Sequence, residues 1–198
     1  TGVTKELFTY VAGLPTRSRE AGGESNTLGA YAEATAELEG LTLTGGVRAD
    51  YWSITNGRLI ERTLATSALI RNDIAPTRTG WGPTGRIGMA WKAAPALTIR
   101  SAAYLGWRLP TLNELYRPFR VGADATAANP ALKPERMKGA EIGFDWFVAE
   151  HARISATAFA NRLDDAIANV TLGSGPGIFP GVGFVAAGGA YRQRQNLD

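Results

Sequence analysis

Residues 28–52 read LGAYAEATAEL, EG and LTLTGGVRADYW, two stretches of alternating apolar and polar side chains on either side of Glu39-Gly40. Successive side chains of a β-strand point to opposite faces, so this period of two predicts two antiparallel strands joined by a tight turn. In 28–38 one face carries only leucine and alanine, and the other face carries Gly29, Tyr31, Glu33, Thr35 and Glu37. The sequence therefore predicts a hairpin with one apolar and one polar face.

The same pattern occurs in two further pairs of segments. The second pair covers 85–92 and 97–107, joined across Ala93-Ala94-Pro95, and the third covers 140–148 and 152–161, joined near Glu150-His151. Successive turns lie about 55 residues apart, which is typical of a repeated hairpin unit. Long segments separate the pairs, and we expect 12–27, 56–82, 108–136 and 163–190 to be loops.

The length of these segments favours a membrane wall. They run about 8 to 12 residues, whereas a soluble strand has about 5 or 6 and a tilted membrane-spanning strand needs about 9 to 11. Trp91 and Trp146 lie near the short turns, and Tyr51 and Trp107 lie at the opposite ends, as in two aromatic belts. A β-sandwich has similar faces strand by strand, but long loops on one side only are unusual in a compact soluble domain.

The predicted fold class is thus all-β: an antiparallel transmembrane β-barrel wall with long extracellular loops and short periplasmic turns. We expect a curved, open sheet with alanine, leucine and tryptophan outside and arginine, threonine and glutamate inside. About eight strand segments are predicted, starting with 3–11 and ending with an incomplete strand over 190–198.

Composition removes several classes of function. The chain has no cysteine and one histidine, which leaves little material for a metal site or a nucleophile–histidine–acid triad. A net charge of +3 over 198 residues is too small to indicate nucleic-acid binding. We expect no catalytic residue, no metal and no cofactor. A soluble carbohydrate-active enzyme, using Glu33 and Asp50 as paired carboxylates, stays as an alternative.

A conspicuous motif lies between the second and third pairs of strands. The stretch 107–116 reads WRLPTLNELY, 129–135 reads NPALKPE, and 141–143 reads EIG. Together they resemble the R-x-P-T-x-x-E-L-Y and N-P-x-L-K-P-E … E-x-G segments of TonB-dependent outer-membrane receptors. Residues 159–167, FANRLDDAI, are similar to a strand end of the same family. The residues that carry the motif are Arg108, Pro110, Thr111, Glu114, Leu115, Tyr116, Asn129, Pro130, Leu132, Lys133, Pro134, Glu135, Glu141 and Gly143.

The motif also has a physical interpretation of its own. Pro110 suits the start of a short helix, and Thr111 with Glu114 has the spacing of a capping box. Arg108, Glu114, Glu135 and Arg136 are expected to pair inside the rim. We therefore interpret the motif as architectural.

The resemblance implies an active-transport receptor of the bacterial outer membrane. Such a receptor has a barrel of about 22 strands, closed by an N-terminal plug. It imports a scarce extracellular ligand, such as an iron–siderophore-type chelate, cobalamin or a carbohydrate, with energy relayed by TonB. Residues 1–198 would be part of a single barrel domain, without the plug and the segment that contacts TonB. Expected partners are TonB and its inner-membrane complex, outer-membrane lipid, lipopolysaccharide and a small ligand. A passive porin is the alternative.

Basic side chains are the candidates for ligand binding. A positively charged vestibule would concentrate anionic ligands. The candidates on the expected lumen face are Arg48, Arg86 and Arg100, and those in the 108–136 loop are Arg117, Phe119 and Arg120.

Overall fold

The computed structural model describes residues 1–198 and is built almost entirely from antiparallel strands. The elements are β1 (Gly2–Val11), β2 (Leu14–Leu38), β3 (Leu41–Thr63), β4 (Leu69–Ile74), β5 (Arg78–Ala94), β6 (Leu97–Arg108), α1 (Leu112–Tyr116), β7 (Phe119–Val121), β8 (Asp124–Ala127), β9 (Glu135–Ala149), β10 (Ala152–Asp164), β11 (Ala166–Ser174), β12 (Gly177–Phe179), β13 (Gly183–Val185) and β14 (Ala190–Leu197). No helix is long and apolar enough to cross a membrane.

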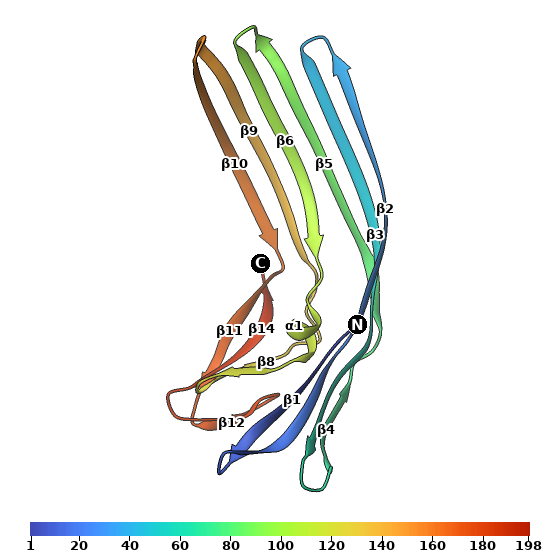
Figure 1. Ribbon diagram of the computed structural model, residues 1–198, viewed down its shortest axis with the longest axis vertical. Helices are drawn as coiled ribbons and strands as arrows, with labels where there is room; N and C mark the ends of the chain where they lie inside the picture. The colour runs from blue at the N-terminus through green and yellow to red at the C-terminus, as the bar shows by residue number, and fades with distance from the viewer.

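One large curved sheet forms the body of the molecule (Figure 1). Its strand order is β1-β2-β3-β5-β6-β9-β10, with β4 paired to β3 beyond the end of β5. The sheet does not close on itself, which confirms the expected open wall. Three tight turns lie at the same end of the sheet, here named the turn end (Figure 1). The opposite end, named the loop end, holds α1, a small sheet of order β11-β14-β8-β7 and the β12–β13 hairpin.

The register of the large sheet confirms the alternation expected from the sequence. Directly opposed residues of antiparallel strands share a face, so each row can be followed across the wall. The rows of the outer face include Leu38–Leu41–Trp91–Ile99–Phe144–Ala156, Ala36–Leu43–Met89–Ser101–Ile142–Ala158 and Ala34–Gly45–Ile87–Ala103–Ala140–Ala160. These side chains are largely exposed, because they lie on the convex apolar face and have nothing packed against them.

The segments expected to be loops are mostly ordered strand. β2 has 25 residues and β3 has 23, so the predicted loop 12–27 is a continuation of the first hairpin. A bulge separates the two parts, because β3 uses Asn56 and Gly57 opposite Gly23 of β2. Asn56 has a φ of 55°, and beyond it the buried positions of β3 change from even to odd numbers. The other expected loops likewise contain β4, α1, β7, β8, β11, β12 and β13.

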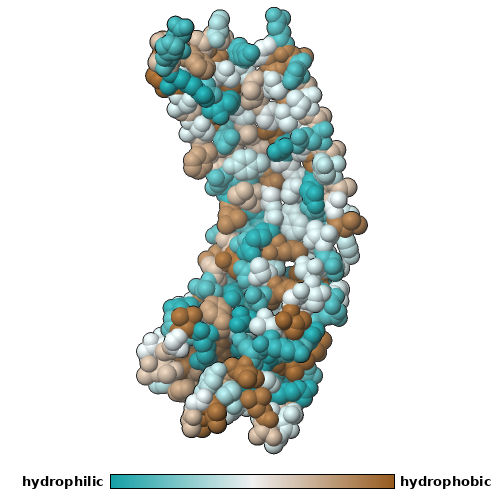
Figure 2. Space-filling view, viewed as in Figure 1, coloured by the Kyte–Doolittle hydropathy of each residue, from teal (hydrophilic) through white to brown (hydrophobic).

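Exposed side chains differ between the two ends. Hydrophilic residues gather at the tips of the turns, whereas apolar side chains reach the surface at the tips of the loop end (Figure 2). Exposed apolar residues of the loop end include Tyr10, Val11, Leu14, Val121, Ile178 and Phe184. The wall thus ends in polar turns on one side and in partly apolar hairpins on the other.

Trp107 departs from its expected position on an aromatic belt. The pairing of β5 with β6 stops at Gly85 and Leu105, so the strands separate beyond this point. The Trp107 ring lies over Gly82, where an added Cβ would meet the indole at 1.9 Å, and packs against the buried cluster around Trp52. The assignment of Trp107 to the outer belt was therefore wrong, since the indole fills the gap between two diverging strands.

Candidate functional site at the loop end

The helix α1 is held by the predicted capping box. Thr111 Oγ1 accepts from the Glu114 amide at 3.2 Å, and the Glu114 carboxylate accepts from the Thr111 amide at 2.6 Å. Leu115 and Tyr116 are buried with Trp52, Ile54 and Leu132. An added Cβ on Gly57 would lie 2.4 Å from the Tyr116 ring, so only glycine there lets the helix approach β3. The motif thus covers the inner face of the wall with a short helix.

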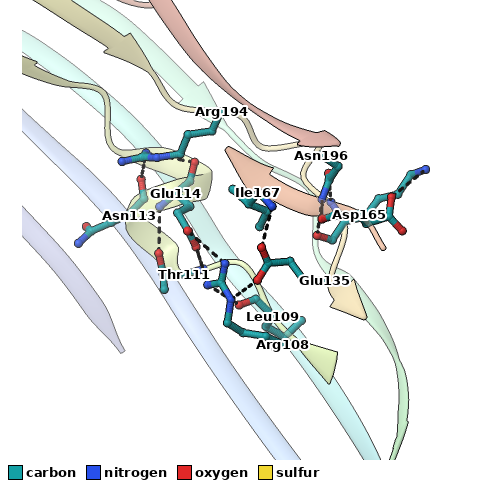
Figure 3. Close-up of polar contacts among 11 residues, drawn as sticks. Arg108, Leu109, Thr111, Asn113, Glu114, Glu135, Asp165, Ile167, Arg194 and Asn196 are labelled. Atoms are coloured by element: carbon teal, nitrogen blue, oxygen red, sulfur yellow. Dashed lines mark hydrogen bonds and ion pairs between the residues drawn. The ribbon is translucent and has the colours of Figure 1, made fainter. Parts of the chain in front are cut away.

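Arg108 joins two acidic residues of the motif. Its guanidinium donates to Glu114 at 3.0 Å and also pairs with Glu135 (Figure 3). Glu135 accepts in addition from the Ile167 amide at 2.6 Å. Burial raises the pKa of Glu114, but hydrogen bonds from Arg108 and Thr111 outweigh it and hold the pKa below its ordinary value. The expected pairing of Arg108 with Glu114 and Glu135 is confirmed, whereas Arg136 has no such partner.

The NPALKPE segment is fastened to β14. Asn129 donates from Nδ2 to the Arg194 carbonyl at 2.8 Å, and its Oδ1 accepts from the Ala131 amide at 3.0 Å. Asn196 accepts from the Lys133 amide at 2.8 Å and donates to the Lys133 and Asp165 carbonyls (Figure 3). Pro130 and Pro134 flank Leu132, which is fully buried. β14 therefore supplies hydrogen-bond partners at both ends of this turn, to Asn129 and to Lys133.

Arg194 contacts the end of α1, and the sequence analysis did not identify it as part of this region. Its Nη1 donates to the main-chain carbonyl of Asn113 at 2.7 Å and more weakly to those of Glu114 and Arg117. Asn113 O also accepts from the Arg117 amide, and Glu114 O also accepts from the Asn129 amide, so Arg194 is a second donor to these two carbonyls at the end of α1. Burial lowers the pKa of Arg194, and its guanidinium lies 4.9 Å from the centre of the Phe119 ring. No signal in the sequence connected β14 with a helix some 80 residues earlier.

Arg117 belongs to a chain of ion pairs over the first three strands. It pairs with Glu6 at 2.9 Å, Glu6 pairs with Arg19 at 3.0 Å, and Arg19 pairs with Glu61 at 2.7 Å. Arg19 also donates to the Pro118 carbonyl at 3.2 Å. This network fixes the segment after α1 on the extensions of β1, β2 and β3.

The remaining loop candidates have structural contacts too. Arg120 donates to the carbonyls of Val182 and Phe184 at 2.6 and 2.7 Å, and so orders the β12–β13 hairpin. The ring of Phe119 lies against Arg194. Ligand binding by Arg117, Phe119 and Arg120 stays a prediction, beside these observed contacts.

The three lumen-face arginines lie on the inner rows of the wall, each next to an acid. Arg48 pairs with Asp50 at 2.6 Å, Arg100 pairs with Asp145 at 2.6 Å, and Arg86 pairs with Glu33. Their side chains remain 44 to 64% exposed and so can still face a ligand. The pairing weakens the expected positive vestibule, because each cation has a carboxylate beside it. It also ties the two carboxylates of the enzyme alternative, Glu33 and Asp50, to arginines.

The last two motif residues lie on the inner face of β9. Glu141 is exposed between Ala102 and Phe159. Gly143 lies between Arg100 and Thr157, where an added Cβ would be 2.7 Å from the Thr157 hydroxyl. No three histidine, aspartate or glutamate side chains are grouped closely enough to hold a metal ion.

Comparison with protein families agrees with this geometry. Residues 4–196 match the family described as TonB dependent receptor-like, beta-barrel. The chain belongs to this family. No curated protein matches the sequence. The family is described as a receptor barrel, which agrees with the expected receptor and not with the alternative of a carbohydrate-active enzyme.

Solved structures of TonB-dependent receptor barrels share the fold. The chain aligns with the copper transporter OprC at 20% identity and a TM-score of 0.62, covering 93% of this chain and 25% of OprC. It aligns with the Serratia marcescens hemophore receptor HasR, solved with its hemophore HasA and heme, at 17% identity and a TM-score of 0.64, covering 98% of this chain and 36% of HasR. The FrpB iron transporter of Neisseria meningitidis gives 19% identity and a TM-score of 0.50 over 91% of this chain and 22% of FrpB. The chain therefore spans between about a fifth and about a third of these proteins.

Proposed function

We propose that residues 1–198 supply barrel wall and loop-end surface to an outer-membrane receptor that imports a scarce extracellular ligand with energy relayed by TonB. The observation that carries this proposal is the family match over nearly the whole chain. The two-faced wall supports it, because a sheet with an apolar convex face and a polar inner face suits a barrel in a bilayer. On this proposal the turn end is periplasmic and the loop end is extracellular.

The domain organisation follows from the same proposal. The wall would be one part of a single barrel of about 22 strands, with a plug domain and a TonB-contacting segment encoded upstream. Sequencing the parent gene tests this directly. A signal peptide, a plug-sized domain and further hairpins would support it. Stop codons immediately on both sides of this segment would contradict it.

For the ligand we propose the classes that this kind of receptor takes up: an iron–siderophore-type chelate, cobalamin or a carbohydrate. An iron chelate is the first to test, since FrpB is an iron transporter and HasR was solved with heme. The loop end supports a capture role, because its hairpins are ordered by the ion-pair network and by Arg194 rather than left free. A preorganised surface loses less entropy on binding.

Uptake by the full-length receptor separates the transport alternatives. Cells that carry it would be given ferric citrate, hemin, cobalamin or maltodextrin, with and without a functional TonB system. Accumulation of one of these that requires TonB supports the receptor. Uptake that continues without TonB would indicate a passive porin instead. Recovery of the protein in the aqueous fraction without detergent would indicate a soluble β-protein.

A further inference from the structure

Two basic side chains project from the outer face of the wall, Lys138 of β9 and Arg162 of β10. They are directly opposed in register, and Leu105 of β6 continues their row. The next row toward the turn end is Ala103–Ala140–Ala160, and the rows beyond it carry no charge. Lys138 and Arg162 are 61 and 71% exposed. They thus lie at the edge of an otherwise uncharged outer face, on the side of the loop end.

The charge around this pair is not balanced. Asp164 is the shared acidic partner, at 3.1 Å from Lys138 Nζ and 2.5 Å from Arg162 Nε. Arg136 lies opposite Asp164 in register and forms no ion pair. Asp198 also lies near enough to act on Arg162 through its charge. Three cations therefore lie near two carboxylates, and the excess positive charge is on the outer face.

The height of the pair agrees with a membrane interface. Arg162 lies ten residues beyond the start of β10, and Tyr51 lies ten residues beyond the start of β3. A tilted strand crosses the bilayer in about 9 to 11 residues, so both positions reach the level of the lipid head groups. Tyr51 packs edge-on against Trp81 there, with ring centres 5.4 Å apart, as residues of an aromatic belt do.

The surface between this interface and the turn end is shaped to receive acyl chains. The alanine row leaves the backbone of β6, β9 and β10 thinly covered. Closer to the turn end, an apolar groove runs along β6, β9 and β10, lined by Leu97, Ile99, Ile142, Phe144, Trp146, Ala156 and Ala158. Large side chains on β9 stand beside alanines on β10, which makes the hollow. The cationic rim thus lies one alanine row away from an apolar groove.

We propose that Arg136, Lys138 and Arg162 bind the phosphate groups of lipopolysaccharide, whose acyl chains lie over the alanine row and the part of the groove nearest to it. This inference rests on the proposed outer-membrane location. Lipid phosphates attract basic side chains at the head-group level. A lipid with two phosphates and several acyl chains matches three cations above a broad apolar strip better than a phospholipid with a single phosphate does.

The test measures lipid bound to the full-length receptor by native mass spectrometry in detergent, with diphosphoryl lipid A as the probe. The double variant K138Q/R162Q is expected to bind it at least about tenfold more weakly than the wild type. The control R17Q/K92Q makes the same change in charge at the β1–β2 hairpin and at the turn end, where neither residue forms an ion pair, and it should bind as the wild type does. D164N removes the competing carboxylate and should strengthen binding.

Three results would overturn the inference: equal binding by wild type and K138Q/R162Q, equal binding of lipid A that lacks its phosphates, or equal competition by phosphatidylglycerol. Heat-dependent migration of the folded barrel in gels excludes a folding defect in each variant, and D164N gives an effect of opposite sign. TonB-dependent uptake is measured separately, so loss of the lipid effect with intact uptake would refute this site and leave the proposed function standing.

Discussion

The hydroxyl of Tyr104 donates to Oδ1 of Asn161 at 2.8 Å across the bare backbone of Gly139. The three residues lie on adjacent strands in one inner row, Tyr104–Gly139–Asn161. In the same row Arg86 meets Glu33 across Gly46. Glycine on the middle strand lets the two flanking side chains meet. Each of these contacts therefore links three adjacent strands on the inner face of the wall.

Replacing Gly139 with alanine should therefore destabilise the wall. The added Cβ would lie 2.1 Å from Asn161 Oδ1 and 2.7 Å from the Tyr104 ring. We expect a loss of about 1 kcal/mol in the free energy of unfolding, because the two side chains must move apart and their hydrogen bond is lost, measured by urea denaturation of the folded full-length barrel. Gly88→Ala is the matched control, because its Cβ would meet only a carbonyl at 3.8 Å. Equal stability of the two variants would contradict this account of the row.

Removing Arg108 should loosen the loop end more than the wall. Without its guanidinium Glu114 and Glu135 would face each other, and the segment from α1 to β9 would lose its link to β6. The half-exposed side chain limits the cost to about 1 kcal/mol, so proteinase K should cut within 117–134 roughly fivefold faster in Arg108→Ala. Arg136→Ala on β9 is the control, since Arg136 forms no ion pair. Unchanged cutting in Arg108→Ala would show that the motif is not a clamp.

Arg194 should not be replaceable by lysine. The three carbonyl contacts all come from Nη1, at the far end of the side chain, and the planar guanidinium also lies 4.9 Å from the centre of the Phe119 ring. A lysine ammonium has no planar group to place against that ring. In Arg194→Lys we expect hydrogen exchange of the α1 amides to rise, with that of β5 and β6 unchanged. Full protection of the α1 amides in Arg194→Lys would mean that a positive charge alone, and not the planar guanidinium, holds the end of the helix.

The network around Glu6 predicts a dependence on pH. Burial raises the pKa of Glu6, but hydrogen bonds and charges of Arg117 and Arg19 outweigh it, so the pKa lies below its ordinary value of 4.5. A depressed carboxyl pKa stabilises the folded arrangement at neutral pH, and this contribution is lost as the pH falls through the folded value.

Hydrogen exchange of the 117–121 segment, corrected for intrinsic rates, should therefore rise below about pH 4. Glu6→Gln should show raised exchange already at neutral pH and a smaller change on acidification. Glu24→Gln on β2 removes a carboxylate that forms no ion pair and should behave as the wild type. The same pH profile in Glu6→Gln and the wild type would remove Glu6 from this role.

The wall was predictable because strand alternation is a local property of the sequence. Rows such as Leu38–Leu41–Trp91 follow from the period of two and from three short turns. The capping box of Thr111 and Glu114 was predictable for the same reason. The pairing of Arg48 with Asp50 had a signal too, because residues two apart share a face of a strand.

The loop end was less predictable because its contacts join distant parts of the chain. Nothing near Asn113 indicates that Arg194 will cover its carbonyl, and nothing near Glu6 indicates Arg117. The strand extensions were mistaken for loops, since the bulge at Asn56 shifts the pattern of β3 by one residue and hides the alternation. Trp107 follows the period of two, but at this position β6 no longer pairs with β5, and the indole turns into the gap between the two strands.

The most direct test of the central claim asks which face of the wall meets lipid. The segment has no cysteine, so single cysteines can be placed in it and spin-labelled in the membrane-embedded full-length receptor. Labels at positions 34 and 140 should be relaxed by oxygen, which dissolves in lipid, and labels at 35 and 141 by a water-soluble nickel chelate. The reverse pattern, or equal access of the chelate to all four positions, would contradict a barrel wall in a membrane.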